Sequence, residues 1–322
     1  MGSENSALSS NIQPIAILND IPNNIKSMAC NIESVLILSD SKVLHLKNYD
    51  GKTTVRRVSL MPNCCCATSN GWAIGFTNGT LSEFDKNLNL ITTYRQPGDT
   101  HAHDEEIVKV MNNEDDNSLC HLISMGKDYT LNFWDHNGNR IFFYKSKYEI
   151  TSFCATPFFV FVSDNQNKIH TIDIDSQYVE TYTVPSSAKK IVSLGEGFAS
   201  LAALNDGSIV ILSESEIVET FHFPITDEIC DVLPLVVEYG TGLITYLTMK
   251  KDGKIFLRAL EENVGEVGES TKLYAESTTH IVTTKDNNIV VYIRDDFETI
   301  SMQFLPNIYL PRTKIAKFLM RQ

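Results

Sequence analysis

The stretch "SMGKDYTLNFWD", residues 124–135, decides the fold. A short apolar segment runs into a polar turn, and a second apolar segment begins immediately after that turn. The first apolar residue after the turn is Leu131, and Trp134 follows three positions later. Two apolar segments around a short polar turn predict a β-hairpin. Repeated units of about 20–50 residues identify repeat architectures, so further copies of this pattern would predict one.

The hairpin pattern occurs seven times. The six further copies lie at 35–46, 72–84, 158–172, 200–212, 243–257 and 280–292. The first apolar residues after the seven turns are Val43, Leu81, Leu131, Ile169, Ile209, Ile255 and Ile289, spaced by 38, 50, 38, 40, 46 and 34 residues. Several of these turns contain Asn-Gly or Asp-Gly, which supply the positive φ angles that tight hairpins need.

Each repeat is long enough for more than one hairpin. Between residues 106 and 145 four strand-like segments follow one another: "EIVKVM", "CHLISM", "TLNFWD" and "RIFFYK". Four antiparallel strands in each repeat, with almost no helical periodicity, are typical of a propeller blade. We therefore predict an all-β, seven-bladed β-propeller with four-stranded blades over 13–305. A flexible tail (1–12) precedes it, and a basic extension (306–322) with a possible short helix follows it.

With "HDEEIVKV" (103–110) ahead of it, the third repeat resembles the signature of the WD-repeat propellers. That signature has a histidine before the first strand, an aspartate in the hairpin between the second and third strands, and a closing Trp-Asp pair. The resemblance implies a structural, non-catalytic hydrogen-bond cluster of His103, Ser124, Asp128 and Trp134, which ties neighbouring strands of the blade together.

Two features show how the chain diverges from the signature of the family that it resembles. Gly126 stands where the family often has serine, and the six other repeats lack the full signature. The aspartate that closes it, Asp135, has counterparts in Asp85 and Asp173. A propeller of another kind, from a trafficking or coat subunit, is the alternative.

Net charge, the N-terminal sequence and the cysteine spacing limit the classes of function and the cellular locations that the chain can have. The formal charge of −13 over 322 residues opposes broad binding to nucleic acid or anionic membranes. The start "MGSENS" lacks a secretory signal, although Gly2 with Ser6 fits a myristoylation pattern. The seven cysteines include no C-x-x-C pair, which favours reduced thiols and a cytoplasmic or nuclear location without integral membrane association.

No motif of catalytic residues stands out, and no cofactor is expected. The chain has no G-x-S-x-G, no H-E-x-x-H and no phosphate-binding glycine loop. The run "HAHDEE" (101–106) offers histidines and acids together, so a metal site is one interpretation. The interpretation that we favour is a structural His103 at the edge of a solvated acidic loop.

Two charged regions are candidates for partner contact. The acidic loops carry Asp104, Glu105, Glu114, Asp115 and Asp116, which either bind a basic partner or are simply solvated. The C-terminal candidates are Arg312, Lys314, Lys317 and Phe318. Phe318 belongs to the i, i+3, i+4 apolar pattern of a short amphipathic helix, which either packs on the propeller rim or binds a partner.

These observations favour a non-enzymatic scaffold for protein–protein interactions, one subunit of a stable multiprotein complex. One alternative is a propeller enzyme or small-ligand binder with its site in the central channel. The other is an accessory subunit of an RNA-modifying enzyme, which would contact nucleic acid through a local basic patch.

The apolar segment "QPIAIL" (13–18) precedes the first full repeat, and we expect it to add a strand to the last blade and close the ring. Deleting residues 1–20 should lower the melting temperature by many degrees, because the last blade loses a strand. Differential scanning calorimetry of the full chain and the deletion tests this. An unchanged melting curve would contradict it.

Overall fold

The computed structural model describes residues 22, 24–113, 119–156, 158–194, 200–213, 217–222, 229–238, 243–250, 252, 254–261, 265–266, 271–274, 278–283, 290–296 and 299–305. Several regions named above lie outside these residues: segment 1–21, the acidic residues Glu114, Asp115 and Asp116, and segment 306–322 with Arg312, Lys314, Lys317 and Phe318.

The described residues form seven antiparallel sheets, each built from strands that are consecutive in sequence. Blade one contains β1 (Ile25–Cys30), β2 (Ser34–Ser39), β3 (Val43–Asn48) and β4 (Thr53–Arg57). Blade two contains β5 (Pro62–Ala67), β6 (Gly71–Phe76), β7 (Leu81–Asp85) and β8 (Leu90–Tyr94). Blade three contains β9 (Ile107–Asn112), β10 (Leu122–Gly126), β11 (Thr130–Trp134) and β12 (Arg140–Lys145). Blade four contains β13 (Ile150–Ala155), β14 (Phe159–Asp164), β15 (Lys168–Asp173) and β16 (Val179–Thr183).

The last three blades complete the ring. Blade five contains β17 (Ala188–Ser193), β18 (Ser200–Leu204), β19 (Ser208–Leu212) and β20 (Ile217–His222). Blade six contains β21 (Ile229–Glu238), β22 (Leu243–Lys250), β23 (Ile255–Glu261), β24 (Gly265–Glu266) and β25 (Thr271–Tyr274). The described strands of blade seven are β26 (Thr278–Thr283), β27 (Val290–Asp296) and β28 (Thr299–Leu305).

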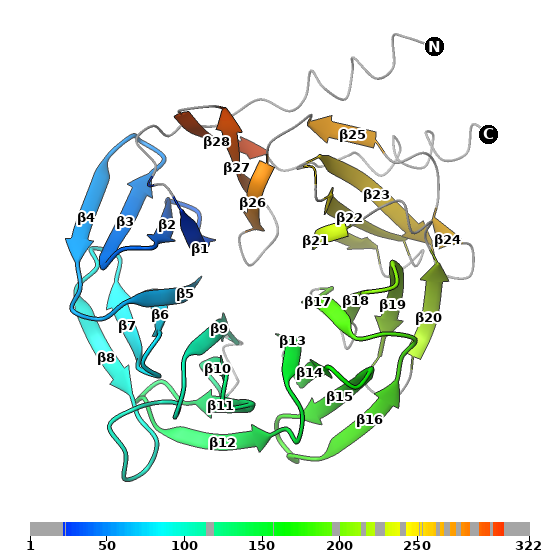
Figure 1. Cartoon of the computed structure of the whole chain (residues 1–322), viewed down its shortest axis with the longest axis horizontal. Helices are drawn as coiled ribbons and strands as arrows, with labels where there is room; N and C mark the ends of the chain where they lie inside the picture. The colour runs from blue at the N-terminus through cyan, green and yellow to red at the C-terminus, as the bar shows by residue number, and fades with distance from the viewer. Residues whose placement is uncertain are drawn as a thin grey trace.

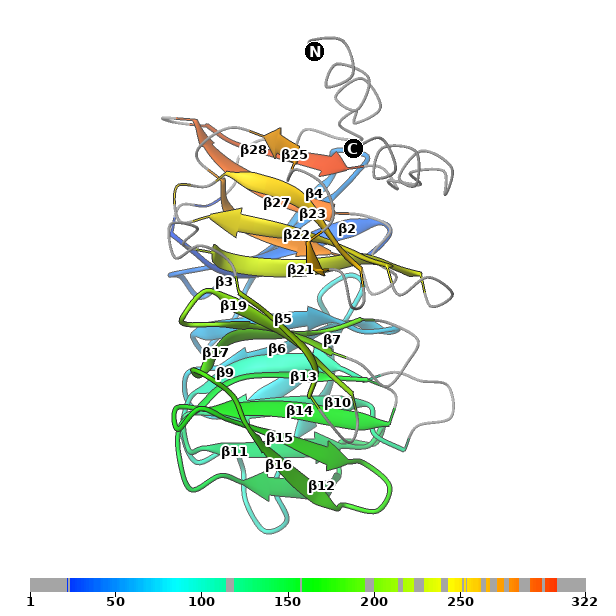
Figure 2. The ribbon, with the colours of Figure 1, turned by 90° about the vertical axis from the view of Figure 1, so that its right-hand side faces the viewer.

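The sheets are arranged radially around one axis (Figure 1). The first strand of each blade lies innermost, and the last strand of blades one to five lies on the outer rim. β26 contacts both β1 and β21, so the two ends of the chain's propeller meet there. Viewed from the side, the ring is a disc whose strands cross from one face to the other (Figure 2). The all-β propeller fold is confirmed. Within the described residues, no helix is long and apolar enough to cross a membrane.

The seventh sequence repeat is displaced by one strand. The hairpin pattern places the turn before Ile289 between the second and third strands of its blade. In the structure this segment joins β26, the innermost strand, to β27, and the next connection lies between Asp296 and Thr299. The prediction is wrong because both inner hairpins of a blade have the same order of apolar strand and polar turn. The unusually short spacing of 34 residues was the sign of this displacement.

The hydrophobic core lies between blades. Because successive side chains of a strand point to opposite faces of its sheet, each blade buries one set against each neighbour. Leu36 and Leu38 of blade one pack with Trp72 and Ile74 of blade two. Further apolar clusters join blades two and three, three and four, four and five, and five and six. Burial of this kind holds neighbouring sheets together at roughly 25 cal/mol per Å² of apolar surface.

A β-bulge interrupts the innermost strand of all seven sheets at the same place. One residue is left unpaired there, and the residue after it is Ser27, Cys64, Lys109, Ser152, Lys190, Asp231 or His280 in blades one to seven. A bulge bends a strand and redirects its side chains. We call these seven positions the post-bulge ring.

Five members of the post-bulge ring bind the inner strand of the next blade. Ser27 Oγ accepts a hydrogen bond from Cys65 N at 3.3 Å, and Ser152 Oγ accepts one from Ile191 N at 3.0 Å. The remaining contacts are Cys64 Sγ to Ile107 O at 3.5 Å, Lys109 Nζ to Phe153 O, and the Lys190–Asp231 ion pair. One repeated position therefore links blades one to six in succession.

Candidate functional site

His103 lies at the end of the loop that leads from blade two into blade three. The backbone N–H groups of Ala102 and His103 both donate to Gly79 O at 3.0 Å, which fixes this loop on the hairpin of blade two. Gly79 has φ +82°, and a Cβ on it would lie 2.1 Å from His103 O. Only glycine fits such a conformation and such a close approach. The Asn78-Gly79 turn of blade two therefore helps to position the histidine of blade three.

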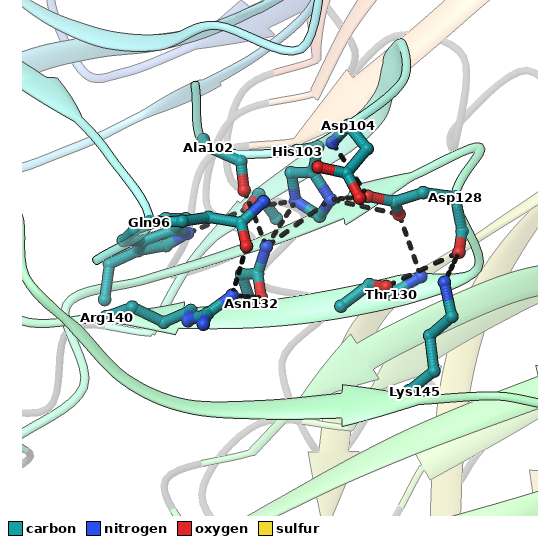
Figure 3. Close-up of polar contacts among 11 residues, drawn as sticks. Gln96, Ala102, His103, Asp104, Asp128, Thr130, Asn132, Arg140 and Lys145 are labelled. Carbon is teal, nitrogen blue, oxygen red and sulfur yellow. Dashed lines mark hydrogen bonds and ion pairs between the residues drawn. The ribbon is translucent and has the colours of Figure 1, made fainter. Parts of the chain in front are cut away.

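The structure brings together the four residues that the resemblance singles out. Trp134 Nε1 donates to Ser124 Oγ at 2.8 Å, and His103 Nε2 lies 2.8 Å from the same oxygen. The other ring nitrogen, His103 Nδ1, lies 3.1 Å from Asp128 Oδ2. With a proton on Nδ1, His103 donates to the Asp128 carboxylate, and Nε2 shares the second hydrogen bond of the chain with Ser124 Oγ. Figure 3 shows His103 directed at Asp128.

Asp128 forms the anionic end of this chain. Its oxygens also accept hydrogen bonds from Thr130 N at 3.0 Å and Asp104 N at 3.1 Å. Burial by itself would raise the pKa of Asp128, but the hydrogen bond and charge of His103 and the two backbone donors outweigh it and lower the pKa. The carboxylate is therefore ionised at neutral pH, as a hydrogen-bond acceptor in this position must be.

Gly126 leaves the space that the His103 ring needs. A Cβ on Gly126 would lie 2.5 Å from both His103 Nδ1 and Asp128 Oδ1. The departure from the family's frequent serine therefore has a local reason in this chain: the ring packs directly against the backbone of β10.

A second set of contacts holds blade three to blade two. Asn132 Nδ2 donates to Ala102 O at 2.7 Å, and Arg140 Nη1 donates to Gln96 Oε1 at 2.6 Å (Figure 3). The Arg140 guanidinium also lies 4.9 Å from the centre of the Phe143 ring. Together with the cluster, these bonds hold the loop from residue 95 to residue 106 against both blades.

Ser124, His103 and Asp128 are hydrogen-bonded in the same order as the serine, histidine and aspartate of a hydrolase triad. Whether a substrate can reach Ser124 therefore decides whether this chain of residues could be catalytic. Ser124, His103 and Trp134 are each 0% exposed. Ser124 Oγ already accepts from Trp134, and no substrate carbonyl can approach a fully buried hydroxyl. A nucleophile must contact its substrate. The geometry is therefore that of an internal brace, in which a buried polar chain is fully satisfied.

Sequence reasoning missed a second buried polar cluster at the boundary of blades two and three. Glu83 is 2% exposed, and its carboxylate accepts from Thr68 Oγ1 and Tyr94 OH at 2.8 Å each. His121 Nε2 lies 3.3 Å from the same carboxylate. Burial acts to raise the pKa of Glu83, but these hydrogen bonds outweigh it and lower the pKa. The available signal was the acid Glu83 at the centre of the strand segment "LSEFD".

The aspartate that closes the signature forms a turn, and aspartates in two other blades form the corresponding turns. Asp135 Oδ1 accepts from Asn137 N at 2.9 Å and Asn139 N at 2.8 Å, which forms the turn between β11 and β12. Asp85 and Asp173 accept backbone N–H groups in the corresponding turns of blades two and four. Short polar side chains that bond the backbone ahead of them are a recognised turn device.

The other site candidates lie apart from the buried cluster. Asp104 and Glu105 are exposed, and the neighbouring Glu106 pairs with Lys127. In the run "HAHDEE", His101 lies 2.9 Å from Thr100 Oγ1 near Asp99, whereas His103 is committed to Ser124 and Asp128. Across the described part of the chain, no three His, Cys, Asp or Glu residues are grouped in a way that would hold a metal ion.

Comparisons with known proteins identify the fold. No family model matches the chain, and no curated protein matches it by sequence. Solved structures do match: the WD40 repeats of RRP9 at TM-score 0.70 and 12% identity, covering 92% of this chain and 99% of that one. U3-55K matches at 0.70 and 11%, with the same coverage, and a chain of the mitotic checkpoint complex at 0.69 and 13%, covering 92% and 95%. The fold is that of the WD-repeat propellers, in a divergent sequence.

Replacing Asp128 with Asn tests the brace. The lowered pKa of Asp128 means that its stabilising contribution is complete above the unfolded-state value of about 3.9 and is lost as the pH falls through the folded-state value. Asp128→Asn should therefore cost about 2 kcal/mol of unfolding free energy at pH 7. The difference from the parent should shrink as the pH falls below about 4. Urea unfolding across this pH range measures it.

The exposed Asp175 provides the matched control, since Asp175→Asn makes the same chemical change on the surface. An Asp128→Asn protein as stable as the control at pH 7 would show that the His103 chain contributes nothing to the fold.

Proposed function

We propose that the protein is a non-enzymatic interaction scaffold, a subunit of a multiprotein complex that presents loops and strand edges on a rigid propeller. The observation that carries this proposal is the closed Ser124–His103–Asp128 chain. The residues that most resemble catalytic groups are buried and satisfied by one another. Their effect is to fix the geometry of blade three, and a fixed geometry is what a docking platform requires.

The printed descriptions of the structural neighbours support the same class. One matching chain belongs to a mitotic checkpoint complex, which is a multiprotein assembly. Fold alone does not determine function, so this support is by analogy. It agrees with the composition of the chain, in which no catalytic motif was found.

The outer strands of blades two and three offer a first contact surface. Leu90 and Ile91 of β8 are 56% and 48% exposed, and Ile141 and Phe143 of β12 are 40% and 51% exposed. Arg95 and Asn139 form a bridge between the segments that flank these strands, so the two strands are neighbours on the rim. Exposed apolar side chains on neighbouring strands are candidates for contact with a partner. We call these four residues the outer apolar strip.

The acidic residues Asp104 and Glu105 offer a second contact surface. They flank the buried cluster on the loop that enters β9, and Asp104 N is fixed by Asp128. A rigidly held acidic pair favours a partner with a basic surface, because complementary charge speeds association and selects among partners.

Affinity purification of the tagged full chain from its native cell tests the scaffold. Stoichiometric partners should copurify with the parent protein. Ile141→Glu with Phe143→Glu, or Asp104→Lys with Glu105→Lys, should reduce recovery of a partner at least tenfold, because each pair removes one contact surface.

Tyr178→Glu serves as the control, since Tyr178 is 66% exposed and lies in blade four. It should leave recovery unchanged. Repeated isolation of the parent protein as a lone monomer would contradict the scaffold, and unchanged recovery with both double variants would contradict the two surfaces.

A further inference from the structure

The connection from blade one to blade two exposes a serine shortly after two arginines. The stretch "RRVSL" (56–60) leads from β4, on the outer rim of blade one, to β5, the innermost strand of blade two (Figure 1). Ser59 is exposed, and among the described residues its hydroxyl makes no hydrogen bond. This hydroxyl is therefore accessible to a second molecule and is not needed to hold the fold.

The residues on either side of Ser59 fix it at the surface. Val58 N donates to Lys42 O at 2.9 Å, which ends the pairing of β4 with its neighbouring strand. The side chains of Val58 and Leu60 are partly buried against the apolar cluster between blades one and two. Ser59 is the exposed residue between these two anchors. The folded chain therefore presents the serine to solvent without any local unfolding.

The two arginines before Ser59 are accessible along the same edge. Arg57 is exposed at the end of β4, and it forms no ion pair with any described residue. Arg56 is half-buried, and it donates one hydrogen bond to Asn89 Oδ1 at 3.0 Å, which leaves its other N–H groups for a partner. No described strand pairs with the outer edge of β4. Another protein can therefore reach both guanidinium groups and the hydroxyl from one side of the ring.

Lys42 adds a third cation beside the serine. It lies opposite Val58, one residue from Ser59, and like Arg57 it is exposed and unpaired within the described part of the chain. Lys42, Arg56 and Arg57 form a local basic patch on a chain whose formal charge is −13. Guanidinium groups pair with carboxylates through parallel hydrogen bonds, so a protein with an acidic groove would select this segment.

We propose that Ser59 is a phosphoryl acceptor for an arginine-directed serine kinase, which recognises Arg56 and Arg57 three and two positions before the hydroxyl. Ser59 Oγ forms a bond to the γ-phosphorus of ATP, the bond from that phosphorus to the β,γ-bridging oxygen breaks, and ADP leaves. The hydroxyl proton passes to the catalytic aspartate of the kinase. The site lies on blade one, apart from the surfaces proposed for partner contact, and it does not depend on the scaffold proposal.

The basic patch also determines what the modification does. A phosphoserine carries a charge of about −1.5 to −2 at neutral pH. Arg57 and Lys42 lie close enough in the chain and in the sheet to pair with it, and neither has another ion pair among the described residues. Phosphorylation would therefore neutralise most of the basic patch and leave a rim whose charge matches the acidic remainder of the protein.

Phosphorylation of the full chain by the catalytic subunit of a cyclic-AMP-dependent kinase, an arginine-directed serine kinase, tests the proposal. With ATP and Mg²⁺, tandem mass spectrometry should place phosphate on Ser59, and Ser59→Ala should remove that signal. Arg57→Ala should lower kcat/KM at least tenfold, because it removes a charge that the acidic groove binds. Arg95→Ala is the matched control: it removes an exposed arginine of blade two and should change kcat/KM less than twofold.

A synthetic peptide of residues 53–63 separates a site that the fold presents from one that only unfolding exposes. The folded chain should be phosphorylated at a rate within tenfold of the peptide rate. A site that needs global unfolding would react about a thousandfold or more slowly, in proportion to the unfolded fraction. The same substitutions in the peptide supply the arginine comparison if a variant chain does not fold. Absence of phosphate on Ser59, equal kcat/KM with and without Arg57, or a parent rate more than tenfold below that of the peptide would overturn the proposal.

Discussion

The ring depends on contacts between neighbouring blades, because the backbone hydrogen bonds of each sheet lie within that sheet and do not join it to the next blade. Two kinds of contact meet this need. Apolar side chains from both faces of each blade pack between sheets, and the post-bulge ring adds a polar link at the inner strands. Ser27, Ser152 and Lys109 perform the same task with different chemistry. The bulge directs the side chain toward the inner strand of the next blade. The side chain then donates or accepts the hydrogen bond that the backbone of that strand offers.

The buried cluster of blade three adds a link between blades two and three. His103 comes from the loop that Gly79 of blade two holds, and it reaches Ser124 and Asp128 of blade three. Ser124 and His103 are fully buried, and their hydrogen bonds join the loop to strands of blade three. Burial separates two groups of residues: those that link elements within the fold are buried, whereas Asp104 and Phe143 are exposed.

Much of this fold was readable from the sequence, and the limits have physical causes. The hairpins of blades one to six follow from apolar segments around polar turns, because that pattern is local. The seventh was displaced, since the connection after β26, "TKDNNI", has the polar composition of a hairpin turn, whereas the connection after β27 is only Phe297 and Glu298. The cluster around Asp128 followed from a resemblance in one blade. The Glu83 cluster and the post-bulge ring were missed, because each includes a contact between two blades, and no local pattern brings Glu83 to His121 or Ser152 to Ile191.

The central claim is that these links make the blades one cooperative unit. Native-state hydrogen–deuterium exchange, followed by mass spectrometry of peptides covering β1, β5, β9, β13 and β17, tests it most directly. The account predicts that the amides of Cys65 and Ile191, which donate to the post-bulge serines, exchange only through global unfolding, at the same free energy as the inner strands around them. Inner strands that open blade by blade, each at its own lower free energy, would contradict it.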